Sequence, residues 1–204
     1  GTWTAQTTFT ETGSLLLYGR STDLSADGNT MVVLSNVEAR VYRRSGGSWT
    51  QAVAVPAPAP DDPSVVINGF PEDVAISGDG SMVAVATPGT RLTSGIQIGR
   101  VHTFDIRGAT PVALQHLTPS GALVNDQWGS GGVTLSCDGS TLAVGAPYVD
   151  NGASLSTGRV AVFTSATPSA SNCAGGGASP SSPAAGTPAS TPSGGASEQQ
   201  SGDG

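Results

Sequence analysis

The sequence has 204 residues, with 15 acidic side chains against 8 basic ones, all arginine, and a formal net charge of −7 at pH 7. Nucleic acids and anionic membrane surfaces are bound through a basic stripe, which this chain lacks, so neither partner is expected. No apolar run approaches the ~20 residues that span a bilayer, so membrane insertion is not expected either.

The first predicted element is a strand at residues 3–10, which contains Trp3, Thr4 and Phe9. The sequence around it, TWTAQTTFT, matches SWTQAVAVP at 48–56, which the repeat pattern below assigns to an outer strand. Residues 3–10 are therefore predicted to be a spare outer strand.

Three repeats follow, at about 15–57, 66–118 and 128–163. Their cores align without gaps: LSADGNTMVV from Leu24, ISGDGSMVAV from Ile76 and LSCDGSTLAV from Leu135. After each core comes ARVYRR, GRVHTF or GRVAVF, and before each comes an aromatic–glycine pair: Tyr18-Gly19, Gly69-Phe70 or Trp128-Gly129. Three elements that recur in one order indicate an internal repeat.

Each repeat is predicted to form short strands joined by tight turns. The first strands are expected at 22–25, 74–77 and 133–136, and the second at 30–35, 82–87 and 141–146. Between them lies an Asp-Gly turn, since glycine accepts the positive φ of a tight reversal: Asp27-Gly28, Asp79-Gly80 and Asp138-Gly139. The (A/G)RV segments supply the third strands, and 49–56 and 111–118 the fourth. Four strands in 50–60 residues without a helical period predict an all-β chain of propeller-type four-stranded blades.

The third repeat is followed by TSATPSASNC, which offers no fourth strand. One outer strand is thus predicted to be spare at the front of residues 1–163 and one to be missing at the back, and three blades are few for a closed ring. Three outcomes are open: a fragment of a longer propeller, a ring of two chains that exchange strands, or a head-to-tail filament.

From residue 164 to 204 the composition is dominated by Ser, Pro, Gly, Ala and Thr, with no aromatic residue after Phe163. Such a segment buries too little apolar surface to offset its conformational entropy, so disorder is expected. It resembles an O-glycosylated stalk, and a plain linker is the alternative. Cys137 and Cys173 form either a disulfide, which would tie the start of this tail to the last repeat, or two free thiols.

Catalytic motifs are absent from the sequence, and no enzymatic activity is expected. His102 and His116 are predicted to be solvent-facing strand residues. Arg40, Arg100 and Arg159 recur at one site of the third strand, where pairing with a carboxylate is expected.

The third repeat resembles an FG-GAP repeat, the blade of integrin-α-type propellers. Trp128-Gly129 matches the "FG" half, and Gly145-Ala146-Pro147 matches the "GAP" half, which is reduced to Ala86-Thr87-Pro88 in the second repeat. The resemblance implies a propeller fold at a cell surface, and family members often bind Ca²⁺ in a DxDxDG loop. Each repeat here has a single Asp before Gly, too few oxygens for calcium. Asp150 and Asn151 are weak calcium candidates, and no other cofactor is expected.

These features predict an extracellular interaction or adhesion module on a Ser/Pro-rich stalk, with a protein or glycan ligand. The alternative is a structural subunit, a homo-oligomer that assembles into a fibre by head-to-tail strand donation.

Overall fold

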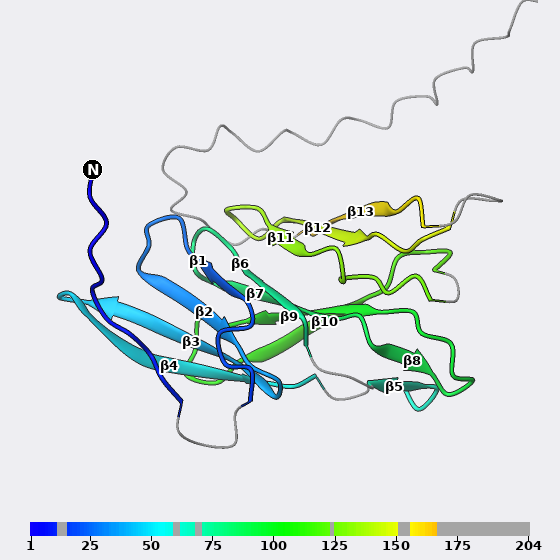
Figure 1. Ribbon diagram of the computed structural model, residues 1–204, viewed down its shortest axis with the longest axis horizontal. Helices are drawn as coiled ribbons and strands as arrows, with labels where there is room; N and C mark the ends of the chain where they lie inside the picture. Colours follow the sequence, from blue (N-terminus) through cyan, green and yellow to red (C-terminus); the bar gives the residue numbers. More distant parts are fainter. Residues whose placement is uncertain (12–15, 59–61, 68–70, 123–124, 151–155, 167–204) are drawn as a thin grey trace, which may run out of the picture. The chain divides into compact units, whose positions relative to one another are not determined.

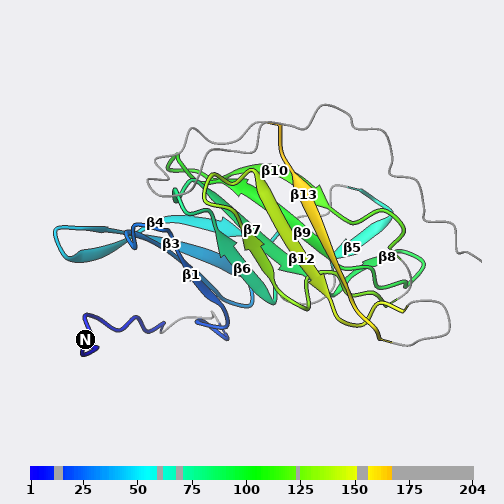
Figure 2. The same cartoon turned by 90° about the horizontal axis from the view of Figure 1, so that it is seen from above.

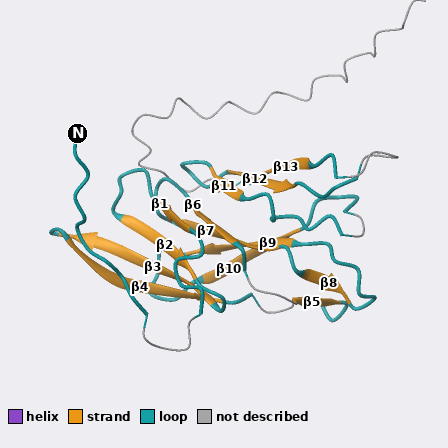
Figure 3. Cartoon of the chain, viewed as in Figure 1, coloured by secondary structure: helices purple, strands orange, loops and turns teal. Residues whose placement is uncertain are grey.

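The computed structural model describes residues 1–11, 16–58, 62–67, 71–122, 125–150 and 156–166. All of them belong to the first of two units, Gly1–Ala174. Their regular structure consists of strands alone (Figure 3), which confirms the all-β prediction. Among these residues there is no helix that could cross a membrane.

Each repeat forms one antiparallel sheet. Sheet 1 has the order β1-β2-β3-β4, sheet 2 the order β6-β7-β9-β10, and the described part of sheet 3 the order β11-β12-β13. The strand bounds are β1 Thr22–Leu24, β2 Thr30–Leu34, β3 Glu38–Ser45, β4 Ser48–Pro56, β6 Asp73–Ile76, β7 Met82–Thr87, β9 Arg100–Asp105, β10 Val112–Leu117, β11 Val133–Leu135, β12 Thr141–Ala146 and β13 Arg159–Thr164.

A fourth, two-stranded sheet pairs β5 (Val65–Ile67) with β8 (Thr90–Leu92). The sequence analysis did not predict it. β8 lies in the long connection between β7 and β9, and an isolated bridge from Arg91 to Gln97 continues its hairpin. The repeat pattern does not indicate this insertion, because among the described residues it occurs in the second repeat only.

Sheet 2 lies between the other two sheets (Figures 1 and 2). In β7, Val83 and Val85 join a buried cluster with sheet 1, while Ala84 and Ala86 join a second cluster with sheet 3. Burial on both faces explains the nearly continuous apolar run of this strand. Each valine that is buried in this way contributes about 1.5–3 kcal/mol.

The first strands of the three sheets are neighbours and are bridged by carboxylates. Asp23 of β1 accepts the backbone N–H of Ile76 at 2.9 Å, and Asp73 of β6 accepts that of Val133 at 2.8 Å. These bonds run from side chain to backbone because the sheets do not pair edge to edge. They fix the order β1, β6, β11 along one side of the molecule.

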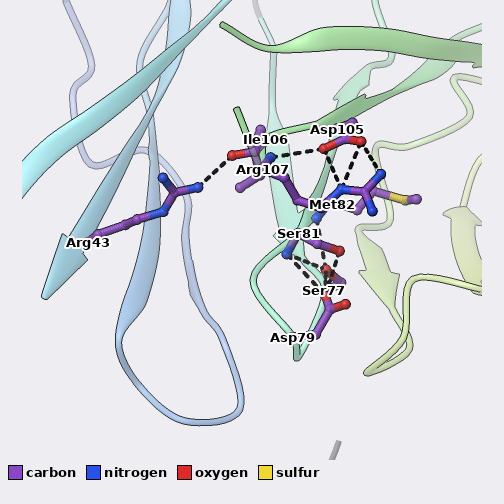
Figure 4. A network of polar contacts seen from close by, with 8 residues as sticks. All are labelled: Arg43, Ser77, Asp79, Ser81, Met82, Asp105, Ile106 and Arg107. Carbon is purple, nitrogen blue, oxygen red and sulfur yellow. Dashed lines mark hydrogen bonds and ion pairs between the residues drawn. The ribbon is translucent and has the colours of Figure 1, made fainter. Parts of the chain in front are cut away.

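The three Asp-Gly turns have the same pattern of hydrogen bonds. In the second repeat the Ser77 hydroxyl donates to Asp79 at 2.6 Å, and the backbone N–H of Ser81 donates to the same oxygen at 3.0 Å (Figure 4). The glycine that follows has a φ of +69° at Gly80, against +65° at Gly28 and +68° at Gly139. An L side chain rarely adopts this conformation, which accounts for the glycine in each repeat.

Successive turns also stack on one another. The backbone N–H of Ala26 donates to the carbonyl of Gly78 at 2.8 Å, and that of Asp79 donates to the carbonyl of Cys137 at 2.9 Å. A Cβ at Gly78 would lie 2.7 Å from the Cys137 sulfur and 2.9 Å from its Cα. The residue after the turn serine is therefore a point of contact between sheets.

The aromatic–glycine pairs close onto the second strands. Gly129 donates its N–H to the carbonyl of Gly145 at 2.9 Å, and Gly19 donates to the equivalent carbonyl of Leu34 at 3.0 Å. Gly69-Phe70 lies outside the described residues. This bond gives a physical reason for the joint recurrence of the two motif halves, since one half binds the backbone of the other.

Candidate interaction site

The outer edge of β13 carries backbone groups that no strand of the described residues occupies. β13 pairs with β12 in the register Thr141↔Thr164 to Ala146↔Arg159, and Ser165 donates its N–H to Ser140. Because hydrogen-bonded pairs alternate along an antiparallel ladder, the backbone groups of Val160, Val162 and Thr164 point away from β12. The edge can therefore accept an added strand.

A groove of about 760 Å³ lies beside this edge, between sheets 2 and 3. Sheet 3 lines it with Leu135, Leu142 and Phe163, and sheet 2 lines it with residues that include Leu114 and Leu117. Leu114 is 46% exposed. The side chains of a strand that is added to β13 would alternate in direction, and every second one would enter this groove.

The rim of the groove is held by an ion pair. Arg107 donates its Nε–H to both carboxylate oxygens of Asp105, at 3.0 and 3.1 Å (Figure 4). The hydrogen bond from Arg107 holds the pKa of Asp105 below its usual range. Nearby, Arg43 of sheet 1 donates to the carbonyl of Ile106 at 2.6 Å and so fixes the end of β9.

The opposite face of β13 is apolar and open. Val160 and Val162 are 71% and 63% exposed, and their side chains point away from the core that Leu142 and Val144 form with sheet 2. In native proteins an exposed edge strand is normally covered by another element or carries charged side chains that prevent association. This face and the edge beside it therefore form one continuous candidate surface.

Residues 1–11 do not form a strand in this chain, although a strand was predicted at 3–10. They contact sheet 1 through side chains. The Phe9 ring lies 4.6 Å from that of Tyr42, Gln6 donates to the carbonyl of Gly47 at 3.0 Å, and Glu11 forms an ion pair with Arg40. Trp3 and Thr4 are exposed, and Trp3 fully so. The backbone of this segment could pair as a strand only with a strand edge that the described residues do not supply.

The arginines of the third strands differ in their surroundings. Arg40 binds Glu38 at 2.6 Å in addition to Glu11, as expected of a strand arginine beside carboxylates. These bonds, with that to Glu38 the largest effect, raise its pKa. Arg159 is exposed on β13.

The prediction that His102 faces solvent is wrong. Its side chain is fully buried, with Nε2 2.8 Å from the Thr87 hydroxyl and Nδ1 2.5 Å from Nδ1 of His116. Thr87 in turn lies 2.9 Å from the Thr90 hydroxyl. His102 lies opposite Val85 in the register of β7 and β9, on the face of sheet 2 whose Val83, Val85 and Phe104 pack with sheet 1. The chain of hydrogen bonds satisfies the imidazole in place of water.

Of the two calcium candidates, only Asp150 lies in the described part of the chain. The carboxylate of Asp150 accepts the N–H of Ser156 at 2.7 Å, and Asn151 lies outside the described residues. No group of three metal-ligating side chains occurs in the described part of the chain. At Asp27 and Asp138, hydrogen bonds from the turn serines lower the pKa of the carboxyl, so these oxygens are already engaged.

Cys137 is disulfide-bonded. Cys173, the other cysteine of the sequence, lies outside the described residues. The bond is anchored at the turn of sheet 3, next to Gly78 of sheet 2.

Comparison with known proteins leaves the family open. No family model matches the chain, and no curated protein matches it. Among solved structures, the chain resembles hydrazine synthase of Kuenenia stuttgartiensis with a TM-score of 0.39 and 21% identity, over 70% of this chain. The match spans 32% of that protein, and a likeness at this level carries no argument about function.

Proposed function

We propose that this chain is an interaction module that binds an extended polypeptide segment along the free edge of β13. One observation carries the proposal: the edge of β13 at Val160, Val162 and Thr164, with which no other strand of the described residues pairs, lies beside a groove of about 760 Å³. Strand addition of this kind draws its affinity from main-chain hydrogen bonds and its specificity from pockets for alternate side chains.

The module is proposed to consist of propeller-type blades similar to FG-GAP repeats. The four-stranded order of sheets 1 and 2 and the bridged first strands β1, β6 and β11 support this reading. In such an arrangement each sheet packs on the next, so the face of β13 with Val160 and Val162 is where a further sheet belongs.

An extracellular or cell-surface location is proposed with it. The support is the disulfide at Cys137, because structural disulfides persist in oxidising compartments. The Ser/Pro-rich residues 164–204 would then serve as a stalk that carries the module.

A selection experiment tests the proposal. Random ten-residue peptides are selected on the immobilised protein, and amide hydrogen exchange is compared with and without each binder. The proposal expects protection at Val160, Val162 and Thr164. Binders that protect only other amides, or a selection that yields no binder, would contradict it.

A matched pair of variants distinguishes peptide binding in the groove from nonspecific hydrophobic binding. Leu114→Asp places a charge in the groove, and Val112→Asp places one on the same strand at a side chain that does not line it. Both side chains are about half exposed in the native protein, at 46% and 58%. Peptide affinity is expected to fall at least about tenfold in Leu114→Asp, as for a central contact of an interface, and to stay unchanged in Val112→Asp.

A further inference from the structure

The N-terminal segment contacts sheet 1 in the same way that β4, the outer strand of sheet 1, contacts sheet 2. Residues 2–10 align with β4, so Phe9 is the counterpart of Val55. Val55 is buried against the face of sheet 2 that carries Phe104. The Phe9 ring packs at a tilt against Tyr42, whose side chain points to the opposite face of β3 from the buried Val41. Phe9 thus has the same relation to sheet 1 that Val55 has to sheet 2.

The sheet to which this outer strand would belong is not present beside it in the described residues. At the other end of the repeats, sheet 3 has a free edge at β13 and no fourth strand among those residues. Within the described residues the segment and the edge are therefore complementary: one is an outer strand without a sheet, and the other is a sheet without an outer strand.

The register of sheet 1 says which residues would meet. In that sheet Trp49 lies opposite Arg44, and Gln51 lies opposite Tyr42. Residues 2–10 align with 48–56, and residues 158–163 align with 39–44. The same register would place Trp3 opposite Phe163 and Ala5 opposite Ala161. Phe163 lines the groove, so the indole of Trp3, fully exposed in this chain, would be directed into it.

We propose that the occupant of the β13 edge is residues 2–10 of a second copy of this chain, with Trp3 as the side chain that fills the groove. The inference rests on the proposed function and names its partner. Phe9 keeps its contact with Tyr42, and the Val160 and Val162 face of one copy packs on sheet 1 of the next. Because the donor and acceptor surfaces differ, the contact is head to tail and yields either a ring or a filament.

Solution mass tests the association. Light scattering on the full chain over a concentration series is expected to show growth in mass that depends on concentration. Trp3→Ala, which removes a side chain without native contacts, is expected to weaken association at least about tenfold, as loss of a central aromatic anchor does. Val66→Ala, at a half-exposed valine of β5 away from both surfaces, is the control and should associate like the native chain.

Cross-linking tests the register. An Ala5→Cys chain is mixed with an Ala161→Cys chain under mild oxidation. The two positions form a non-hydrogen-bonded pair, with Cα atoms about 4.5 Å apart, within the range of a disulfide. A heterodimer is expected from this mixture, and a much smaller yield when Thr4→Cys replaces Ala5→Cys, because the Thr4 side chain points to the other face.

The inference would be overturned by a single-copy mass at every concentration, by association of Trp3→Ala equal to that of the native chain, or by equal cross-linking at residues 4 and 5. Protection of the Val160, Val162 and Thr164 amides in the monomer would also overturn it, because the edge would then be occupied within one chain. If selected peptides still bind at β13 while the chain does not associate, the second copy is the wrong occupant and the proposed function stands. If they do not bind, the proposed function fails as well.

Discussion

Substitution of Gly78 by alanine probes how the turns of successive sheets stack. The added Cβ would lie 2.7 Å from the Cys137 sulfur and 2.9 Å from its Cα. The backbone on both sides is held, since Ala26 donates to the Gly78 carbonyl and Asp79 donates to the Cys137 carbonyl. Relief of the overlap therefore requires the turns to separate.

The expected cost follows from two opposing effects. Overpacking in a tight contact destabilises by roughly 1–3 kcal/mol. Alanine also restricts the unfolded chain relative to glycine, which stabilises by about 0.4–1 kcal/mol. The overlap is the larger effect at the midpoints of the two ranges, so we expect a net loss of about 1.3 kcal/mol and at most about 2.6 kcal/mol, which lowers Tm by several degrees in a chain of this size.

Gly108→Ala is the matched control. The nearest atom to a Cβ there is the Thr110 carbonyl oxygen at 3.4 Å, an ordinary contact, and the residue is exposed. This variant should be as stable as the native protein or slightly more so. Urea unfolding of the three proteins, with the disulfide intact, measures the difference. Equal midpoints for Gly78→Ala and Gly108→Ala would refute the stacking of the turns.

Three further predictions concern single groups. Hydrogen bonds from the turn serines, that of Ser136 first, lower the pKa of Asp138, so its stabilisation is present above the ordinary carboxyl pKa of 3.8 and is lost as pH falls through the folded value. Asp138→Asn should thus cost on the order of 0.5 kcal/mol at pH 7, because this part-exposed carboxylate is screened by water, and unfolding curves of the two proteins should converge in acid. His102→Leu removes the hydrogen bonds of the buried imidazole to the Thr87 hydroxyl and to Nδ1 of His116, and should cost about 1–3 kcal/mol, measured by urea unfolding; a variant as stable as the native chain would contradict the buried hydrogen-bond chain. In denaturant without reductant, Cys137 and Cys173 should give no reaction with a thiol reagent, and peptide mapping should recover them joined; two free thiols would exclude the bridge.

The sequence determined most of the local structure. β7 and β12 span the predicted residues, and β1, β2, β6 and β11 differ from the predictions only at their ends. These elements follow from alternating or continuous apolar runs and from Asp-Gly pairs whose glycine must adopt a positive φ. Such signals act within a few residues, so a single chain displays them without its neighbours.

Only the tertiary structure decided what depends on packing between sheets. His102 was predicted to be a solvent-facing strand residue, yet it lies on the face of sheet 2 that packs with sheet 1, and Thr87 and His116 satisfy its nitrogens. Residues 3–10 have the pattern of a strand, yet their backbone pairs with no strand edge of the described residues, where the contacts to sheet 1 are made by side chains. The groove beside β13 arises between the sheets of two successive repeats, from side chains that lie tens of residues apart in the sequence, such as Leu114 and Phe163. A strand's pattern shows which residues face inward, but burial and pairing depend on which surfaces meet, and those contacts are long-range.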